Sequence, residues 1–316
     1  HKMLISGSSK AGKSFLLMEL CIAIAEGRTW LGFPCKKGRV LYVNLEIDPA
    51  SAINRFLRIY EALGIPIRHS DDIVIWNLRG HAVPLDQLVP KLIRRVRDQH
   101  FDAIIIDPIY KVITGDENNA SEMGAFCNQF DKICTETGCS TIYCHHHSKG
   151  AQGAKRAMDR ASGSGVFARD PDAQLDMIQL ELSDDLKNNV RDGNATAWRL
   201  ESSLREFPNI VPVNFWFEYP IHRIDNSGDL DAAYAEGSPM GNLSRSKKYT
   251  TAEERKASID AAYDVCSIET PVSLEAMADY MGVSTRCARD RIKECKDEYV
   301  IKGGFVAKIS KTENRE

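Results

Sequence analysis

The sequence lacks any long hydrophobic run. No window approaches the roughly 18 uninterrupted apolar residues that a membrane-spanning helix needs. The first residues also lack the charged region, the apolar region and the cleavage site of a secretory signal. We therefore expect a cytoplasmic protein that contacts no membrane.

The sequence also lacks paired cysteines and a strong net charge. Its nine cysteines are scattered without a C-x-x-C pair, so we expect reduced thiols and no disulfide framework. Cys134, Cys139 and Cys144 lie near one another, but their spacing matches no zinc module and favours buried thiols. The net charge of −3 excludes a basic field over the whole protein, so any contact with nucleic acid must be local.

What the sequence does contain is a phosphate-binding motif close to its start. Residues 7–14 read GSSKAGKS and satisfy the pattern G-x-x-x-x-G-K-[ST]. This pattern requires a strand before it and a helix after it. The apolar run 2–5 predicts the strand, and the strongly apolar run 15–25 predicts the helix. The alternative is a glycine-rich turn that binds nothing.

The motif predicts a site for ATP and Mg²⁺. Its glycines let backbone N–H groups surround a phosphate, and the N-terminus of the following helix adds partial positive charge. Lys13 is expected to reach the β- and γ-phosphates, and the Ser14 hydroxyl to bind Mg²⁺. The residues predicted to contact the nucleotide are Gly7, Ser8, Ser9, Lys10, Ala11, Gly12, Lys13, Ser14 and Phe15.

A second residue on the metal side of the site is predicted at Asp107. The apolar run 101–106 predicts a buried parallel strand, and Asp107 closes it. In P-loop enzymes an acidic residue at such a strand end, the Walker B aspartate, helps to hold the metal. The alternative is an ordinary aspartate at a strand end.

The carboxylate that activates water must come from elsewhere, because the residue after Asp107 is Pro108. Residues 39–46 form another β-rich run that ends on Glu46, and a helix is predicted from about 50 to 63. A glutamate at the carboxyl edge of a strand beside the P-loop strand can face the γ-phosphate and orient water. We predict that Glu46 is the catalytic base, with a purely structural role as the alternative.

Three consecutive histidines, residues 145–147, follow the run 141–144. Consecutive residues of a strand point to opposite faces, which disfavours convergence of all three on one metal ion. A polar residue at this strand end is expected to lie over the γ-phosphate and to respond to its loss. We predict His145 or His146 in this sensor role, and metal binding is the alternative.

Residues 148–169 read SKGAQGAKRAMDRASGSGVFAR and have little apolar periodicity. The segment predicts a mobile basic loop. Either it contacts phosphates, of DNA or of ATP on a neighbouring subunit, or it is a solvated surface loop.

In their order along the chain, these motifs resemble the RepA-type hexameric replicative helicases, which are RecA-like ATPases of plasmids, phages and integrated mobile elements. The blocks that carry the resemblance are GSSKAGKS, YVNLEIDPASAINR, FDAIIIDPIYK, YCHHHSKG and RASGSGVFARDPDA, across roughly residues 2–220. The resemblance implies an α/β fold with a RecA-like P-loop core and a mostly parallel sheet. It also implies a homo-oligomeric ring, in this family a hexamer, with ATP between subunits and single-stranded DNA in the channel.

The resemblance also assigns roles to individual residues. It places the Walker lysine and serine on Lys13 and Ser14. The catalytic glutamate falls on Glu46 and the metal-side aspartate on Asp107. The sensor histidine falls on His145 or His146.

An arginine finger donated to a neighbouring subunit is also implied, but this sequence has Asp172 at the position of the family's arginine. Arg169 is predicted to replace it, with Arg160 as the second candidate. The family's channel loops correspond to the acidic segment 113–121 and the basic segment 149–160. Neither contains an aromatic residue, so DNA contact would depend on phosphates.

The remainder of the chain predicts three further parts. Segments 176–182, 197–204 and 214–219 alternate apolar and polar residues, which predicts antiparallel strands that extend the sheet. We therefore predict an ATPase domain at 1–224, a linker at 225–250 and a small winged helix domain at 251–316. The elements expected in the last part are helices at 252–266, 274–281 and 285–296 and a hairpin at 299–307.

The last predicted helix is strongly basic. It carries Arg286, Arg289, Arg291, Lys293 and Lys296, which suits a helix that enters a DNA groove. Residues 245–316 as a whole contain 14 basic and 13 acidic residues. Duplex binding and docking to a protein subunit therefore both stay open.

Together these patterns predict an ATP-hydrolysing RecA-like motor, a replicative DNA helicase of a mobile element that acts as a ring. One alternative is a non-translocating ATPase switch that loads or regulates a DNA-processing partner. Another is a protein that binds a DNA site and whose oligomeric state is controlled by nucleotide.

Overall fold

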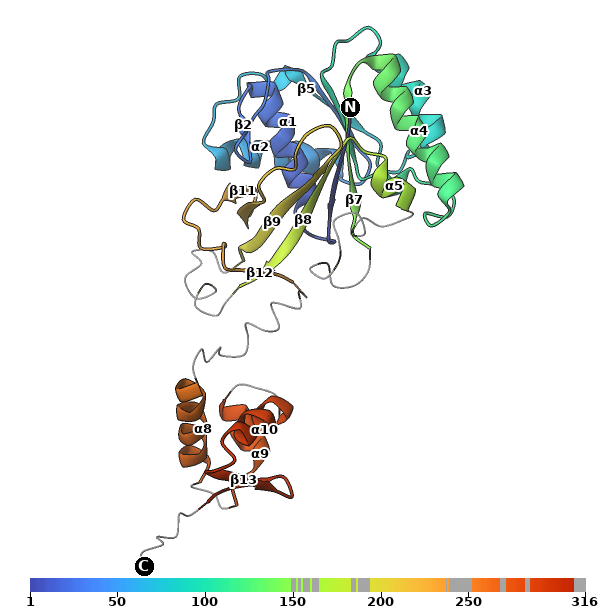
Figure 1. Cartoon of the computed structure of the whole chain (residues 1–316). Coiled ribbons are helices and arrows are strands. Elements are labelled where there is room, and N and C mark those ends of the chain that lie inside the picture. Colours follow the sequence, from blue (N-terminus) through green and yellow to red (C-terminus); the bar gives the residue numbers. More distant parts are fainter. Residues whose placement is uncertain are drawn as a thin grey trace, which may run out of the picture. The chain divides into compact units, whose positions relative to one another are not determined.

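The computed structural model describes most of the chain in two compact units, His1–Ser238 and Pro239–Glu316 (Figure 1). The described residues are 1–148, 152, 155, 160, 165–182, 186, 194–236, 238, 252–267, 271–281 and 285–309. Most of the predicted basic loop and part of the predicted linker lie outside them. No helix among these residues has the length and apolar character needed to cross a bilayer.

The first unit is built on one sheet whose central strands are parallel (Figure 1). In spatial order these are β5 (Ile73–Asn77), β4 (Val40–Asn44), β6 (Ala103–Asp107), β7 (Ser140–His146), β1 (Lys2–Gly7) and β8 (Ala173–Glu181). Antiparallel strands β9 (Thr196–Leu204), β10 (Val213–Glu218) and β11 (Ile221–Ile224) extend the sheet beyond β8. The predicted extension is confirmed, although β8 itself is parallel to β1.

Helices cover both faces of this sheet, as its uninterrupted apolar strands require. One face packs against α1 (Lys13–Glu26) and α2 (Pro49–Leu63), and the other against α3 (Leu85–Val96), α4 (Ala120–Thr137) and α5 (Gly165–Arg169) (Figure 1). Alternate residues of one strand enter different cores: Tyr42 packs on the α1 side and Leu41 on the α3 side. The predicted α/β class with a mostly parallel sheet is confirmed by this architecture.

The helix ends follow local chemistry. Asp48 caps α2, because its carboxylate accepts the Ser51 N–H at 3.0 Å, and Pro49 occupies the first turn. Asn119 caps α4 by accepting from Ser121 and Glu122. Short elements complete the unit: β2 (Thr29–Trp30), β3 (Phe33–Pro34), the 3₁₀ turns η1 (Ser70–Asp72) and η2 (Ile109–Lys111), and β12 (Tyr234–Ala235).

Residues 225–236, which the sequence predicts as the start of a linker, pack on the first unit. β12 pairs with β8, and Leu230 is fully buried against Leu180 and Ala197. The loop before β12 is held by Asp225, whose carboxylate accepts the Gly228 and Leu230 N–H groups. Hydrogen bonds from a side chain to the backbone can hold a loop in place even when its sequence has no apolar periodicity. This segment has no such periodicity, so its sequence resembles that of a linker.

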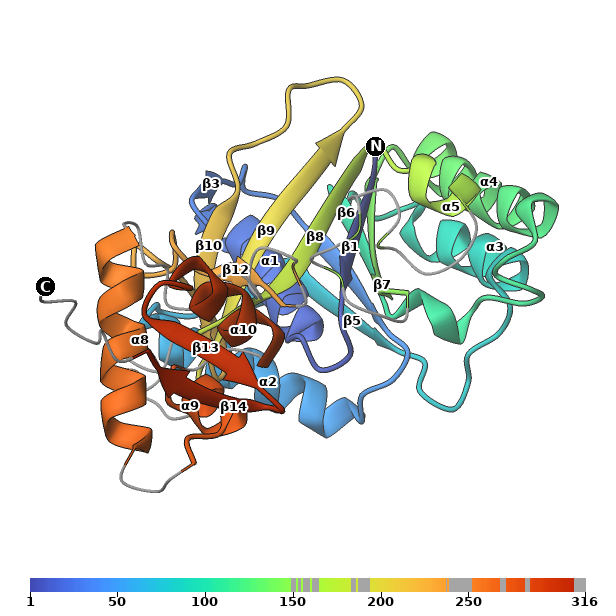
Figure 2. The same cartoon turned by 60° about the horizontal axis from the view of Figure 1, so that its bottom comes forward.

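The described residues of the second unit form three helices and a hairpin (Figure 2). They are α8 (Ala252–Cys266), α9 (Leu274–Tyr280), α10 (Thr285–Glu294), β13 (Tyr299–Lys302) and β14 (Phe305–Lys308). The three helices and the hairpin share one hydrophobic core, to which they contribute the buried residues Ile259, Met277, Ile292 and Val306. These elements lie where the sequence predicts them, and the winged helix assignment stays a prediction.

Candidate nucleotide site

The phosphate-binding loop connects β1 to α1 in a tight turn. Gly12 precedes α1 with φ 80°, in the left-handed region that glycine adopts without strain. The ammonium group of Lys13 donates to the carbonyl oxygens of Gly7 at 2.9 Å and Ser8 at 2.7 Å. Burial lowers the pKa of Lys13. The lysine is thus fixed inside the turn, next to the free N–H groups of the helix start.

A buried contact between a histidine and a carboxylate supports the turn from behind. A Cβ atom at Gly12 would lie 3.1 Å from Nε2 of His222 and 3.4 Å from Cζ of Phe217. The His222 ring is held by Glu19 of α1, whose Oε1 lies 2.5 Å from Nδ1 and 3.2 Å from the His222 backbone nitrogen. The hairpin β10–β11 is therefore clamped against α1, and a side chain at position 12 would have to displace the His222 ring and adopt a strained backbone.

We predict that Gly12→Ala weakens ATP binding by about 10-fold or more, because alanine must adopt a left-handed backbone and its methyl group must displace the His222 ring. Titration with a fluorescent ATP analogue measures the change. Gly124→Ala in α4 is the matched control: its added Cβ meets nothing within 4 Å, and alanine favours a helix. Unchanged affinity of the Gly12 variant would contradict the described packing.

A cavity of about 720 Å³ opens over this turn. It brings together the predicted residues Ser9, Lys10, Ala11, Gly12, Lys13, Ser14, Phe15, Glu46, Asp107 and His146. It also brings in residues that the sequence did not assign to this site: Ile47, Asp48, Ser51, Arg55, Arg79, Tyr110, Cys144 and Phe217. Gly7 and Ser8 contribute their backbone carbonyl oxygens to the site, because both oxygens accept hydrogen bonds from the Lys13 ammonium group.

The carboxylate of Asp107 is buried at the end of β6, with a relative exposure of 3%. The Tyr42 hydroxyl donates to Oδ2 at 2.5 Å, and the Cys144 thiol donates to Oδ1 at 2.9 Å. Burial raises the pKa of both donors well above their ordinary values, so both stay protonated. β7 lies between β1 and β6 in the sheet, so the aspartate and the phosphate loop face the cavity from strands that are not neighbours.

Glu46 is exposed at the cavity wall, just beyond the end of β4. Its position depends on Asn44, a fully buried residue whose Oδ1 accepts the Ile47 N–H at 2.9 Å and whose Nδ2 donates to Asn77 at 2.8 Å. Tyr110 is a hydrogen-bonding neighbour of Glu46. Sequence reasoning missed Asn44, although a buried amide at a strand end is a recognisable signal for a fixed turn.

The structure separates the three histidines. His146 lies in the cavity with Nδ1 at 3.3 Å from the Lys13 ammonium, and its ring centroid is 5.4 Å from that of Tyr110. Burial and the charge of Lys13 lower the pKa of His146. His145 points to the opposite face, where Nε2 is 3.5 Å from Glu117 and the ring packs on Phe167.

Burial lowers the pKa of His145 to about 4, so this ring is neutral at pH 7. It does not line the nucleotide cavity. The sensor role predicted for one of the two histidines therefore has His146 as its candidate.

The two candidate arginine fingers lie away from this cavity. Arg169 is exposed at the end of α5. Arg160 is buried, forms an ion pair with Glu201 and donates to the Gln152 carbonyl. Arg169 is therefore accessible to another molecule, whereas Arg160 would first have to leave its ion pair with Glu201.

Aromatic residues form one wall of the cavity. The ring of Phe15 contacts Phe217 at 5.7 Å and Tyr219 at 5.3 Å between centroids, and the Arg55 guanidinium lies 4.8 Å from its centre. Flat apolar rings beside a phosphate cradle suit a purine base. Only Phe15 was predicted, because its partners come from distant parts of the sequence.

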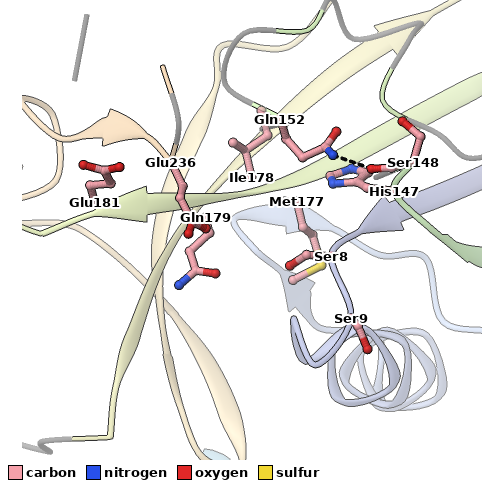
Figure 3. Close-up of a pocket in the computed structure, with 10 residues that line it drawn as sticks. All are labelled: Ser8, Ser9, His147, Ser148, Gln152, Met177, Ile178, Gln179, Glu181 and Glu236. Atoms are coloured by element: carbon pink, nitrogen blue, oxygen red, sulfur yellow. Dashed lines mark hydrogen bonds between the residues drawn. The ribbon is translucent and has the colours of Figure 1, made fainter. Parts of the chain in front are cut away.

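A second cavity of about 500 Å³ lies on the other side of the phosphate loop and shares Ser9 with the first (Figure 3). Figure 3 shows His147, Ser148 and Gln152 at one end and Glu181 and Glu236 at the other. His147 is buried, with Nε2 at 3.5 Å from Asp176, so it faces neither His145 nor His146.

The donor set of the first cavity fits a magnesium nucleotide. A hydroxyl group, Ser14, and a carboxylate, Asp107, are oxygen ligands of the kind that Mg²⁺ prefers. A turn that disfavours a Cβ at position 12, a buried lysine and a helix N-terminus together provide a cradle for phosphates.

Comparison with known proteins agrees with this geometry. Residues 2–152 match the protein family described as "AAA domain". The matched segment contains the phosphate loop, Glu46, Asp107 and the three histidines. Among solved structures, the chain is similar to one described as an "ATPase Domain", with 13% identity and a TM-score of 0.49, over 68% of this chain and 80% of that one.

Proposed function

We propose that the first unit hydrolyses ATP with Mg²⁺ and drives a ring-shaped DNA helicase in the cytoplasm, of the kind that replicates mobile elements. The observation that carries the proposal is the convergence of Lys13, Asp107 and Glu46 on one cavity. A cation, a metal-side carboxylate and a free carboxylate are the three groups that hydrolysis of a phosphoanhydride needs.

In this proposal each residue has a distinct task. The loop N–H groups and Lys13 hold the β- and γ-phosphates, and Ser14 with Asp107 would hold Mg²⁺. When bound, the metal neutralises charge on the phosphate oxygens. Glu46 orients a water molecule and accepts its proton while the water oxygen bonds to the γ-phosphorus. The bond to the bridging oxygen then breaks and leaves ADP and phosphate.

His146 is placed to report the state of the γ-phosphate. It contacts the Lys13 ammonium, and it ends β7, from which the chain continues into the predicted DNA-contacting segment. Loss of the γ-phosphate changes what Lys13 contacts, and His146 is the side chain on β7 that meets this lysine. We propose it as the sensor.

Ring assembly is supported by the order of the motifs and by Arg169, which is exposed and remote from the cavity of its own chain. A residue so placed is available to a neighbouring copy as an arginine finger. A hexamer with single-stranded DNA in its channel follows from the resemblance to RepA-type helicases.

The second unit is proposed to be a winged helix domain that contacts duplex DNA. Support comes from the three helices and the hairpin among its described residues, and from the exposed side chains of Arg286, Arg289 and Lys293 on α10 and of Lys296 just after it. The near balance of charge in the whole unit favours a competing role as a docking module for a protein. In that role the protein would be a non-translocating ATPase switch.

The proposal predicts that the full chain forms a closed ring with an ATP analogue, that single-stranded DNA stimulates its ATPase, and that it unwinds a forked substrate. Native mass spectrometry with and without the analogue measures the ring. Lys13→Ala is the control for ATP-dependent unwinding. If single-stranded DNA does not stimulate the ATPase and no unwinding is seen, the helicase proposal is contradicted and the non-translocating ATPase switch is favoured. Sequence-selective duplex binding by the full chain without unwinding would favour a DNA-site-binding protein.

A further inference from the structure

The carboxylate of Asp107 is held from both sides by two residues to which the sequence analysis assigns no role in the site. β6 lies between β4 and β7. Tyr42 of β4 donates to one carboxylate oxygen at 2.5 Å, and Cys144 of β7 donates to the other at 2.9 Å. The backbone carbonyl of Asp107 also accepts the Leu45 N–H at 2.9 Å. The aspartate is thus fixed in orientation as well as in position.

These two donors are themselves rigid. Tyr42 has no exposed surface, and its ring packs edge-on against Phe56 at 5.6 Å. Cys144 is 1% exposed in the middle of the sheet. Close packing around both side chains favours a single geometry for each hydrogen bond.

A carboxylate has about four lone-pair sites, and one donor on each oxygen leaves the others available. A side chain that is already oriented loses little rotational freedom when it binds a ligand. A carboxylate without these donors would rotate about its terminal torsion, and two buried acceptor atoms would lose their partners.

We propose that Tyr42 and Cys144 are positioning residues that set the affinity of the site for its divalent metal by holding Asp107. This inference rests on the proposed function, in which Asp107 lies on the metal side of the site. Neither residue contacts the nucleotide in this role. They act through the aspartate, as hydrogen-bonding neighbours of metal ligands do in other metal sites.

Three substitutions separate this role from a general contribution to packing. Tyr42→Phe removes one hydroxyl and keeps the ring that contacts Phe56. Cys144→Ala removes the thiol, and Cys144→Ser keeps a donor of similar size. The matched control is Tyr143→Phe: Tyr143 is also fully buried, next to Cys144 in β7, but its hydroxyl has no hydrogen-bond partner among the described residues.

The measurement is Mn²⁺ affinity in the presence of a non-hydrolysable ATP analogue, followed by electron paramagnetic resonance. Binding of the same analogue in EDTA and the melting temperature are measured in parallel. We expect Tyr42→Phe and Cys144→Ala to weaken Mn²⁺ binding by about 10-fold while metal-free nucleotide binding is unchanged. Cys144→Ser and Tyr143→Phe should bind Mn²⁺ like the unmodified protein.

Two results would overturn the inference. Mn²⁺ affinity equal to that of the unmodified protein in both Tyr42→Phe and Cys144→Ala means that the donors do not position the aspartate. An equal loss of affinity in Cys144→Ala and Cys144→Ser means that packing, and not the donated hydrogen bond, matters. Failure of the proposed function is visible separately, because then the unmodified protein binds no Mn²⁺ with the analogue. If Tyr42→Phe fails to fold, the comparison of alanine with serine at position 144 decides alone.

Discussion

Lys13→Ala is expected to lower ATP hydrolysis by about three orders of magnitude. The ammonium group is buried in the turn, where it is bonded to the Gly7 and Ser8 carbonyl oxygens and directed at the site of the phosphates. Its removal withdraws a preorganised cation from a poorly solvated cavity, and such groups stabilise developing charge far more than they would in water. Steady-state kinetics and direct ATP binding measure the loss.

The control for this substitution is Lys132→Ala. Lys132 lies on the surface of α4 and is about half exposed, with only a long contact of 3.9 Å to Glu136. It should hydrolyse ATP like the unmodified protein. Activity of Lys13→Ala above about a tenth of the original would exclude the phosphate-binding role, because Lys10, the other lysine that lines the cavity, is exposed and not buried in the turn.

Glu46→Gln is expected to lower kcat by about 10²- to 10⁴-fold while ATP affinity changes little. The amide keeps the size of the side chain but cannot accept the proton of the attacking water. Because Glu46 is exposed, the substitution removes no buried hydrogen bond and should leave the melting temperature unchanged. Single-turnover hydrolysis and equilibrium binding separate the two effects.

Glu61→Gln, on the exposed side of α2, is the matched control for Glu46. It should leave both kcat and ATP affinity unchanged. If Glu46→Gln raised KM with kcat unchanged, Glu46 would be a binding residue and the base would have to lie elsewhere in the cavity.

The parts of the site that the sequence predicts are those encoded by short contiguous patterns. The turn from β1 to α1 follows from its glycines and the apolar runs beside it. Asp107 and Glu46 follow from their places at the ends of β6 and β4. Edges of parallel strands meet on one side of a sheet, so residues at such ends converge without any knowledge of the strand order.

The parts that the sequence does not predict depend on residues far apart in the chain. Glu19 and His222 are separated by 203 positions, and no periodicity connects them. A carboxylate inside the apolar helix α1 is a signal that a buried partner exists, but it does not say which residue this is. The alternation of side chains along a strand predicts that His145 and His146 lie on opposite faces of the sheet. It does not predict which face each one occupies, because that depends on the helices that cover the sheet.

The position of β7 in the sheet has a consequence for communication within the protein. One strand touches both halves of the site, because Cys144 bonds to Asp107 and His146 contacts Lys13. A ligand that shifts β7 itself would disturb both contacts. By thermodynamic reciprocity, ATP would then alter the affinity for that ligand by the same factor as the ligand alters the affinity for ATP.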